Sequence, residues 1–250
     1  MFKYMSQKTR NVMHVVILIT VIIAIVFGVV MIMVRYEEKG ETNMPFQLKE
    51  LSVISKADGI RKDNPENKWD IDVMQNNDVY LQIEKNTNYN GEEAIDNIEL
   101  SNIQILQTPQ VGEIKIFRPS AAEGNLYTED QENLITDHIK YQGTKQTNLK
   151  TLELTNQGGI ISFRIGIRNL GNYVSNEDTE VRYDGTLLDK MKITNEQLKT
   201  KISFDIIIST KSEKQYKGTI PLEIPVGDIV KEGVSNMQKT DFSDIIFKRL

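Results

Sequence analysis

The chain has 250 residues, of which 39% are hydrophobic and 26% are charged, proportions typical of a globular protein. Its formal net charge of -5 gives no reason to expect a nucleic-acid partner, which requires clustered positive charge. The chain has no cysteine, which excludes disulfide bonds, cysteine-bound zinc and a thiol nucleophile, and no cofactor is predicted.

An apolar run predicts a transmembrane helix at residues 12–34. The run contains no Asp, Glu, Lys or Arg, and about 20 apolar residues in a helix span the hydrocarbon core of a bilayer. Lys3, Lys8 and Arg10 precede the run without any acidic residue. Because basic flanks stay in the cytoplasm, we expect a cytoplasmic stub at residues 1–11, a single pass through the cell membrane and an extracytoplasmic C-terminal region.

Two alternatives share an apolar N-terminal segment with this prediction. A cleaved signal peptide has an apolar region of about 7–15 residues that ends in small residues. Here the run is longer and ends in Met-Val-Arg at residues 33–35. A type IV pilin carries a glutamate just inside its helix, and this run has none. Both comparisons favour an uncleaved anchor.

The rest of the chain reads as a linker followed by many short strands. Residues 35–45 are polar and predict the linker. From residue 46 apolar and polar residues alternate, which indicates half-buried strands. The predicted strands cover residues 46–57, 69–74, 79–85, 95–107, 113–117, 160–169, 201–210 and 216–226. Asn76, Asn77 and Asp78 predict a turn that makes residues 69–85 a hairpin.

Other local signals refine this prediction. Pro221 and Pro225 indicate an edge strand or a strand end. Capping-box patterns beginning at Thr128 and Thr194 predict two short helices. The apolar centre of residues 240–250 predicts that this segment docks on the strands, as a last strand or on a partner.

These elements predict a mainly β fold: an N-terminal transmembrane helix followed by an immunoglobulin-like or related β-sandwich at residues 46–250, with one or two short helices. A single sandwich and two subdomains divided near residues 110–150 are both compatible with the pattern, and we favour one domain.

Few residues point to chemistry. Asn86–Gly91 has the spacing of a calcium loop but offers neutral asparagines where carboxylates are needed, and residues 176–184 form a loose acidic cluster. We interpret both as surface loops and predict no metal site. Asp70 and Asp72 share a strand face, and His138 is the only histidine outside the apolar run. No nucleophile elbow accompanies that histidine, so no enzymatic activity and no catalytic residue are predicted.

A basic strand face is the remaining candidate site. Arg164 and Arg168 lie on the polar side of one predicted strand. With Lys115 and Arg118 they predict a surface for an anionic wall polymer or a lipid headgroup. The alternative interpretation is that they pair with acidic residues on neighbouring strands.

Several motifs together resemble a group of uncharacterised single-pass membrane proteins from low-GC Gram-positive bacteria. The motifs are MPF at 44–46, VISKADG at 53–59, WDIDV, QNND and IEK within 69–85, YDGTLL at 183–188, and FKR near the end. The resemblance implies an anchored extracytoplasmic β domain and no activity or site residue.

The sequence therefore predicts a membrane-anchored interaction or structural module of the cell envelope. Its expected partners are the lipid bilayer, through residues 12–34, and an envelope protein. Ligand or wall-polymer binding through the basic face is the first alternative, and a hydrolase that uses two carboxylates is the second.

Overall fold

The computed structural model describes residues 7–64, 66–120, 126–142, 153–177 and 180–250. The chain divides into two compact units, Met1–Thr42 and Asn43–Leu250, and each is described by itself.

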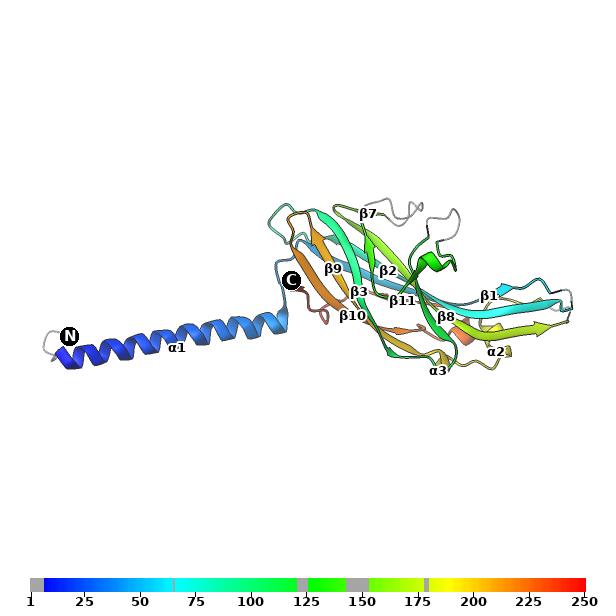
Figure 1. Ribbon diagram of the computed structural model, residues 1–250, viewed down its shortest axis with the longest axis horizontal. Helices are drawn as coiled ribbons and strands as arrows, with labels where there is room; N and C mark the ends of the chain where they lie inside the picture. The colour runs from blue at the N-terminus through cyan, green and yellow to red at the C-terminus, as the bar shows by residue number, and fades with distance from the viewer. Residues whose placement is uncertain (1–6, 65, 121–125, 143–152, 178–179) are drawn as a thin grey trace. The chain divides into compact units, whose positions relative to one another are not determined.

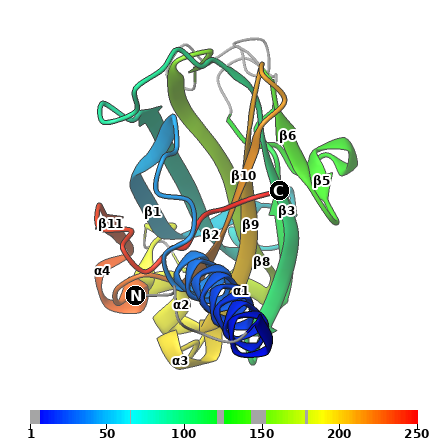
Figure 2. The same cartoon turned by 90° about the vertical axis from the view of Figure 1, so that its left-hand side faces the viewer.

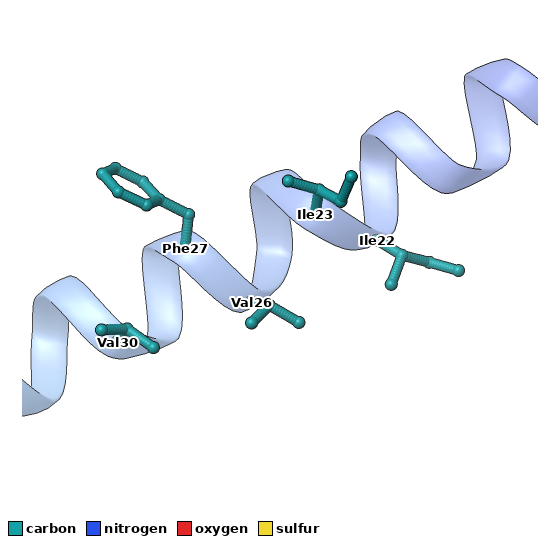
Figure 3. Close-up of a pocket in the computed structure, with 5 residues that line it drawn as sticks. All are labelled: Ile22, Ile23, Val26, Phe27 and Val30. Atoms are coloured by element: carbon teal, nitrogen blue, oxygen red, sulfur yellow. The ribbon is translucent and has the colours of Figure 1, made fainter.

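The first unit contains one long helix, α1 (Gln7–Lys39). It is long and apolar enough to cross a membrane, and its most apolar window contains no buried residue. Figure 3 shows the side chains of residues 22, 23, 26, 27 and 30 projecting from the ribbon of this helix. The predicted span at residues 12–34 lies within α1, which confirms a single apolar N-terminal helix.

The predicted linker at residues 35–45 differs from the structure at both of its ends. α1 continues to Lys39, since Glu and Lys are good helix formers, and it ends at Gly40, whose φ of 67° is the left-handed conformation of a helix C-cap. Met44 is only 7% exposed and belongs to the core of the second unit.

The second unit consists of two antiparallel sheets (Figure 1). The first has the order β11-β1-β2-β8-β4-β5, with β7 beside β8, and the second has the order β12-β10-β9-β3-β6. The first sheet contains β1 (Phe46–Arg61), β2 (Trp69–Lys85), β4 (Glu113–Phe117), β5 (Leu134–Ile135), β7 (Leu154–Thr155), β8 (Gly158–Ser175) and β11 (Val234–Lys239). The second contains β3 (Ile95–Gln107), β6 (Ile139–Tyr141), β9 (Thr200–Thr210), β10 (Gln215–Ile224) and β12 (Lys248–Arg249). This confirms the mainly β fold.

The three longest strands, β1, β2 and β8, support two separate hydrophobic cores. Over one part of their length they face the second sheet, and the rings of Phe163 and Phe204 meet edge to face with 5.2 Å between centroids. Over the other part they face three short helices, as Figure 1 shows. These helices are α2 (Gly185–Lys190), α3 (Asn195–Leu198) and α4 (Ile229–Glu232). Because the second sheet is shorter than these strands, the helices supply the apolar cover that it lacks.

The predicted hairpin at residues 69–85 is wrong, because β2 is one continuous strand of 17 residues. Two polar residues at its centre, Gln75 and Asn77, are buried. Together with Ser55 of β1 they form what is here called the buried polar layer. Ser55 Oγ donates to Asn77 Oδ1 at 2.7 Å, and Asn77 Nδ2 donates to the Ile165 carbonyl at 3.0 Å. Because neighbouring strands satisfy these groups, the strand continues through residues that locally favour a turn.

The two capping patterns have different outcomes. At Thr194 the prediction is confirmed: its side chain and that of Gln197 cap each other's backbone N–H groups at the start of α3. The helix predicted after Thr128 is wrong, because the chain forms only the 3-10 turn η1 (Gln131–Asn133) and then the strands β5 and β6. Leu134 and Ile135 pair with β4, and this pairing replaces helical hydrogen bonds.

The C-terminal segment docks as predicted. Ile245 is 8% exposed and belongs to the first core, and β12 pairs with Tyr216 and Lys217 of β10. In Figure 2 this segment, coloured red, runs to the strands of the second sheet. Beyond that pairing β10 is an edge of the described sheet, which agrees with Pro221, and Pro225 directly follows its last residue.

Candidate functional site

The structure places three of the four predicted basic residues, Lys115, Arg164 and Arg168, on one side of the first sheet. β4 and β8 are neighbours, with Arg164 opposite Phe117 and Gly166 opposite Lys115. Lys115 is half-buried, and Arg118 follows β4 as an exposed residue. The predicted juxtaposition is therefore present, and its chemistry depends on what surrounds each cation.

Arg164 forms a two-pronged ion pair with Asp78, the residue opposite it on β2. Its Nε and Nη2 donate to the two carboxylate oxygens at 2.6 and 2.9 Å, and each side chain is only 12% exposed. Its guanidinium also lies over the ring of Tyr127, 4.4 Å from the centroid. Burial, the largest single influence, lowers the pKa of Arg164, but the hydrogen bonds to Asp78 and the negative charge nearby together outweigh it, and the pKa is raised.

Arg168 forms a similar two-pronged ion pair with Glu129, which lies in the segment before η1. Its Nη2 and Nε donate to Glu129 at 2.6 and 2.8 Å, and its guanidinium lies 5.0 Å from the centre of the Phe117 ring. The Arg168 side chain is 7% exposed, so the carboxylate of Glu129 compensates a nearly buried charge.

Tyr127 lies beside the Arg164–Asp78 ion pair. It is 3% exposed, and its hydroxyl donates to Ser162 Oγ at 2.8 Å. Burial raises its pKa well above the ordinary value, so it stays a neutral hydrogen-bond donor. Tyr127 and Glu129 together hold the segment that follows residue 125 against β8. Both predicted arginines are thus bound by carboxylates, Arg164 by a residue of the neighbouring strand, as the alternative interpretation of this face expects, and Arg168 by Glu129, which is outside the strands; the wall-polymer alternative has little support from them.

The other candidate carboxylates also have partners. Asp70 accepts hydrogen bonds from the side-chain amides of Asn64 and Asn172 at 2.7 and 2.8 Å, and these bonds lower its pKa. A general acid needs a raised pKa, so this environment suits a structural carboxylate. Asp72 is 2.6 Å from Lys62 Nζ.

The predicted loops are occupied by structural hydrogen bonds. Asn86 donates through Nδ2 to the Met44 carbonyl and accepts through Oδ1 from the Asn88 N–H, which is turn geometry. Within the acidic cluster Asp184 caps α2, while residues 178 and 179 lie outside the described residues. No group of three His, Cys, Asp or Glu residues suited to a metal occurs in the described residues. His138 is more than half exposed and lies 3.0 Å from Asp137.

One surface was not predicted: the outer edge of β3 at residues 102–107, here called the β3 edge. β6 pairs only with Ile98–Leu100, and no other described strand lies beside β3 on that side. Two consecutive apolar side chains, Ile105 and Leu106, are 46% and 61% exposed there. In the sequence the adjacent pair Ile-Leu interrupts the alternation of the strand, and that was the available signal.

Comparisons with protein-family models, curated proteins and solved structures gave no match to this chain.

Proposed function

We propose that the chain is a membrane-anchored, extracytoplasmic interaction module that binds an extended segment of an envelope protein along the β3 edge. The observation that carries the proposal is the β3 edge, which no strand of the described residues covers and where Ile105 and Leu106 are exposed, in a chain that also has an apolar helix long enough to cross a membrane.

The anchor follows from the surface of α1. Apart from Met13, its Val, Ile, Leu, Met and Phe side chains are about half exposed or more. Apolar surface in water costs about 25 cal/mol per Å2, so such a helix is stable in hydrocarbon and costly in water. The basic residues ahead of the helix place the β unit outside the cytoplasm.

Binding at the β3 edge follows from backbone hydrogen bonding. A strand at the edge of a sheet presents N–H and C=O groups that an added strand satisfies. Ile105 and Leu106 are both exposed at this edge, so an added strand with apolar residues covers one or both of them. Register shifts with β9 at Ser101/Gln104 and Ile105/Gln107 bend this edge, so it suits a short segment.

Cysteine substitution tests both parts, because the natural chain has no cysteine. The variant Leu106→Cys places one thiol on the β3 edge, and Val234→Cys is the matched control on β11, where Val234 is 55% exposed. We expect a membrane-impermeant thiol reagent to label both variants on intact cells. We expect a short thiol cross-linker to capture the same envelope protein from Leu106→Cys and not from Val234→Cys.

Two results would contradict the proposal. Labelling that requires cell lysis would refute the extracytoplasmic location. Equal recovery of every cross-linked protein from the two variants would refute the β3 edge. The double variant Ile105→Lys/Leu106→Lys adds a second measurement, since charged residues on an edge strand oppose strand addition, and recovery of the partner should fall.

A further inference from the structure

Three residues meet on the outer face of the β1–β2 pair in an arrangement that neither the fold nor the proposed function requires. Lys56 and Asn76 are directly opposite each other in the antiparallel register, and Asp58 lies two residues beyond Lys56 on the same face. One carboxylate oxygen contacts both neighbours: Asp58 Oδ2 is 3.3 Å from Lys56 Nζ and 3.0 Å from Asn76 Nδ2.

The Asn76 side chain is unusual for a residue in the middle of a strand. The residue is 1% exposed, and its carbonyl oxygen Oδ1 has no hydrogen-bond partner among the described residues. Buried polar atoms are normally satisfied, so an exception calls for an explanation. The nitrogen of the same Asn76 amide donates to the Asp58 carboxylate, and that carboxylate also contacts Lys56.

The surroundings favour reaction at this amide. The second carboxylate oxygen of Asp58 accepts from the Gly59 N–H at 2.9 Å, which fixes the orientation of the carboxylate. Gly166 lies opposite Asn76 on β8, and the Arg168 guanidinium packs so closely against Gly166 that a Cβ there would be 2.1 Å from Nη1. The Arg168 guanidinium therefore lies on the same face of the sheet as Asn76, where its donors are bound by Glu129 and by the Gln75 carbonyl.

We propose that Lys56 and Asn76 form an intramolecular amide cross-link, with Asp58 as the general acid and base. Asp58 accepts a proton from the Lys56 ammonium, and the neutral Nζ attacks Cγ of Asn76. Asp58 then returns the proton to Nδ2 as the Cγ–Nδ2 bond breaks, and the extra proton that Nζ carries after its attack passes through the Asp58 carboxylate to the released ammonia. The new bond is Nζ–Cγ, the leaving group departs as ammonium, and Asp58 ends as a carboxylate.

The cross-link covalently joins the first two strands of the β unit. Lys56 and Asp58 are 35% and 33% exposed, so the amine and acid formed by proton transfer are partly shielded from water, which lowers the cost of the neutral pair. The reaction needs no cofactor and no second protein. It does not depend on the proposed function, because neither the anchor nor the β3 edge takes part.

Intact-mass spectrometry of the full chain purified in detergent tests the proposal. We expect the wild-type protein to be lighter than its sequence by one ammonia, and fragmentation to show a peptide joined through Lys56 and Asn76. Lys56→Met and Asp58→Ala should restore the full mass. Lys62→Met is the matched control, because Lys62 also contacts a carboxylate, Asp72, at 2.6 Å but takes no part in the proposed bond, and it should keep the loss.

Three results would overturn the proposal. The first is a wild-type protein with its full sequence mass. The second is an ammonia loss that persists in Lys56→Met, which would assign the loss to cyclisation at another asparagine, such as Asn90 before Gly91. The third is persistence in Asp58→Ala, which would remove Asp58 from the reaction. Mass does not depend on stability, so a poorly folded variant does not obscure the wild-type measurement.

Discussion

Replacing Asn77, a fully buried residue of β2, with alanine should destabilise the β unit strongly. Its side chain forms four hydrogen bonds: it accepts from Ser55 and Gln75, and it donates to Gln75 and to the Ile165 carbonyl. At about 1 kcal/mol for each lost bond, Asn77→Ala should lower the free energy of unfolding by about 4 kcal/mol. The exposed Asn88→Ala should change it by less than about 0.5 kcal/mol.

Urea denaturation of the full chain in detergent measures these changes, with the fluorescence of Trp69, the only tryptophan, as the probe. Gln75→Leu/Asn77→Leu should cost less than Asn77→Ala, because the single variant takes from Gln75 Oε1 the hydrogen bond donated by Asn77, whereas the double variant removes that buried oxygen. If Asn77→Ala lowered the free energy of unfolding by less than about 1 kcal/mol, the buried polar layer would not be a cooperative network. A greater destabilisation by the double variant than by Asn77→Ala would lead to the same conclusion.

Three further predictions concern packing, capping and pH. Phe163→Ala removes a ring that is fully buried against the second sheet, and urea denaturation should show a loss of about 4 kcal/mol; a loss under about 1 kcal/mol would contradict the packing. Thr194→Ala removes the capping box of α3 and should cost about 1 kcal/mol in the same assay, so an unchanged midpoint would contradict its role. Hydrogen bonds from Lys214 and then Ser212 lower the pKa of Glu93 below its ordinary 4.5, so its carboxylate stabilises the folded state above that pH and loses this effect as the pH falls. The stability advantage of wild type over Glu93→Gln should therefore shrink between about pH 5 and pH 3, and a constant difference would be inconsistent with the shift.

Strands with a regular alternation were predictable to the residue. Residues 95–107 and 113–117 form β3 and β4 with the predicted bounds, although the burial of β3 departs from strict alternation where its register with β9 shifts. The two capping patterns were locally equivalent, yet only the one at Thr194 begins a helix. Leu198, at the end of that helix, is fully buried in the second core, whereas Leu134 finds a strand partner in β4.

The candidate site was predictable in position but not in chemistry. The alternation placed Arg164 and Arg168 on one face, and the strand order then brought Lys115 near them. Their carboxylate partners, Asp78 and Glu129, are 86 and 39 residues away in the chain, so no local pattern indicates them. The β3 edge could not be predicted either, because the sequence of β3 does not show where its pairing with another strand, here β6, ends.

The sequence by itself determined that the chain has one long apolar helix and many alternating strands, because hydration and side-chain period act within a few neighbouring residues. Only the tertiary structure decided that polar residues 75–78 continue a strand, that the arginines are paired, and that Lys56, Asp58 and Asn76 meet. Those outcomes depend on which strands become neighbours, because the hydrogen-bond and ion-pair partners of these polar side chains come from distant parts of the chain.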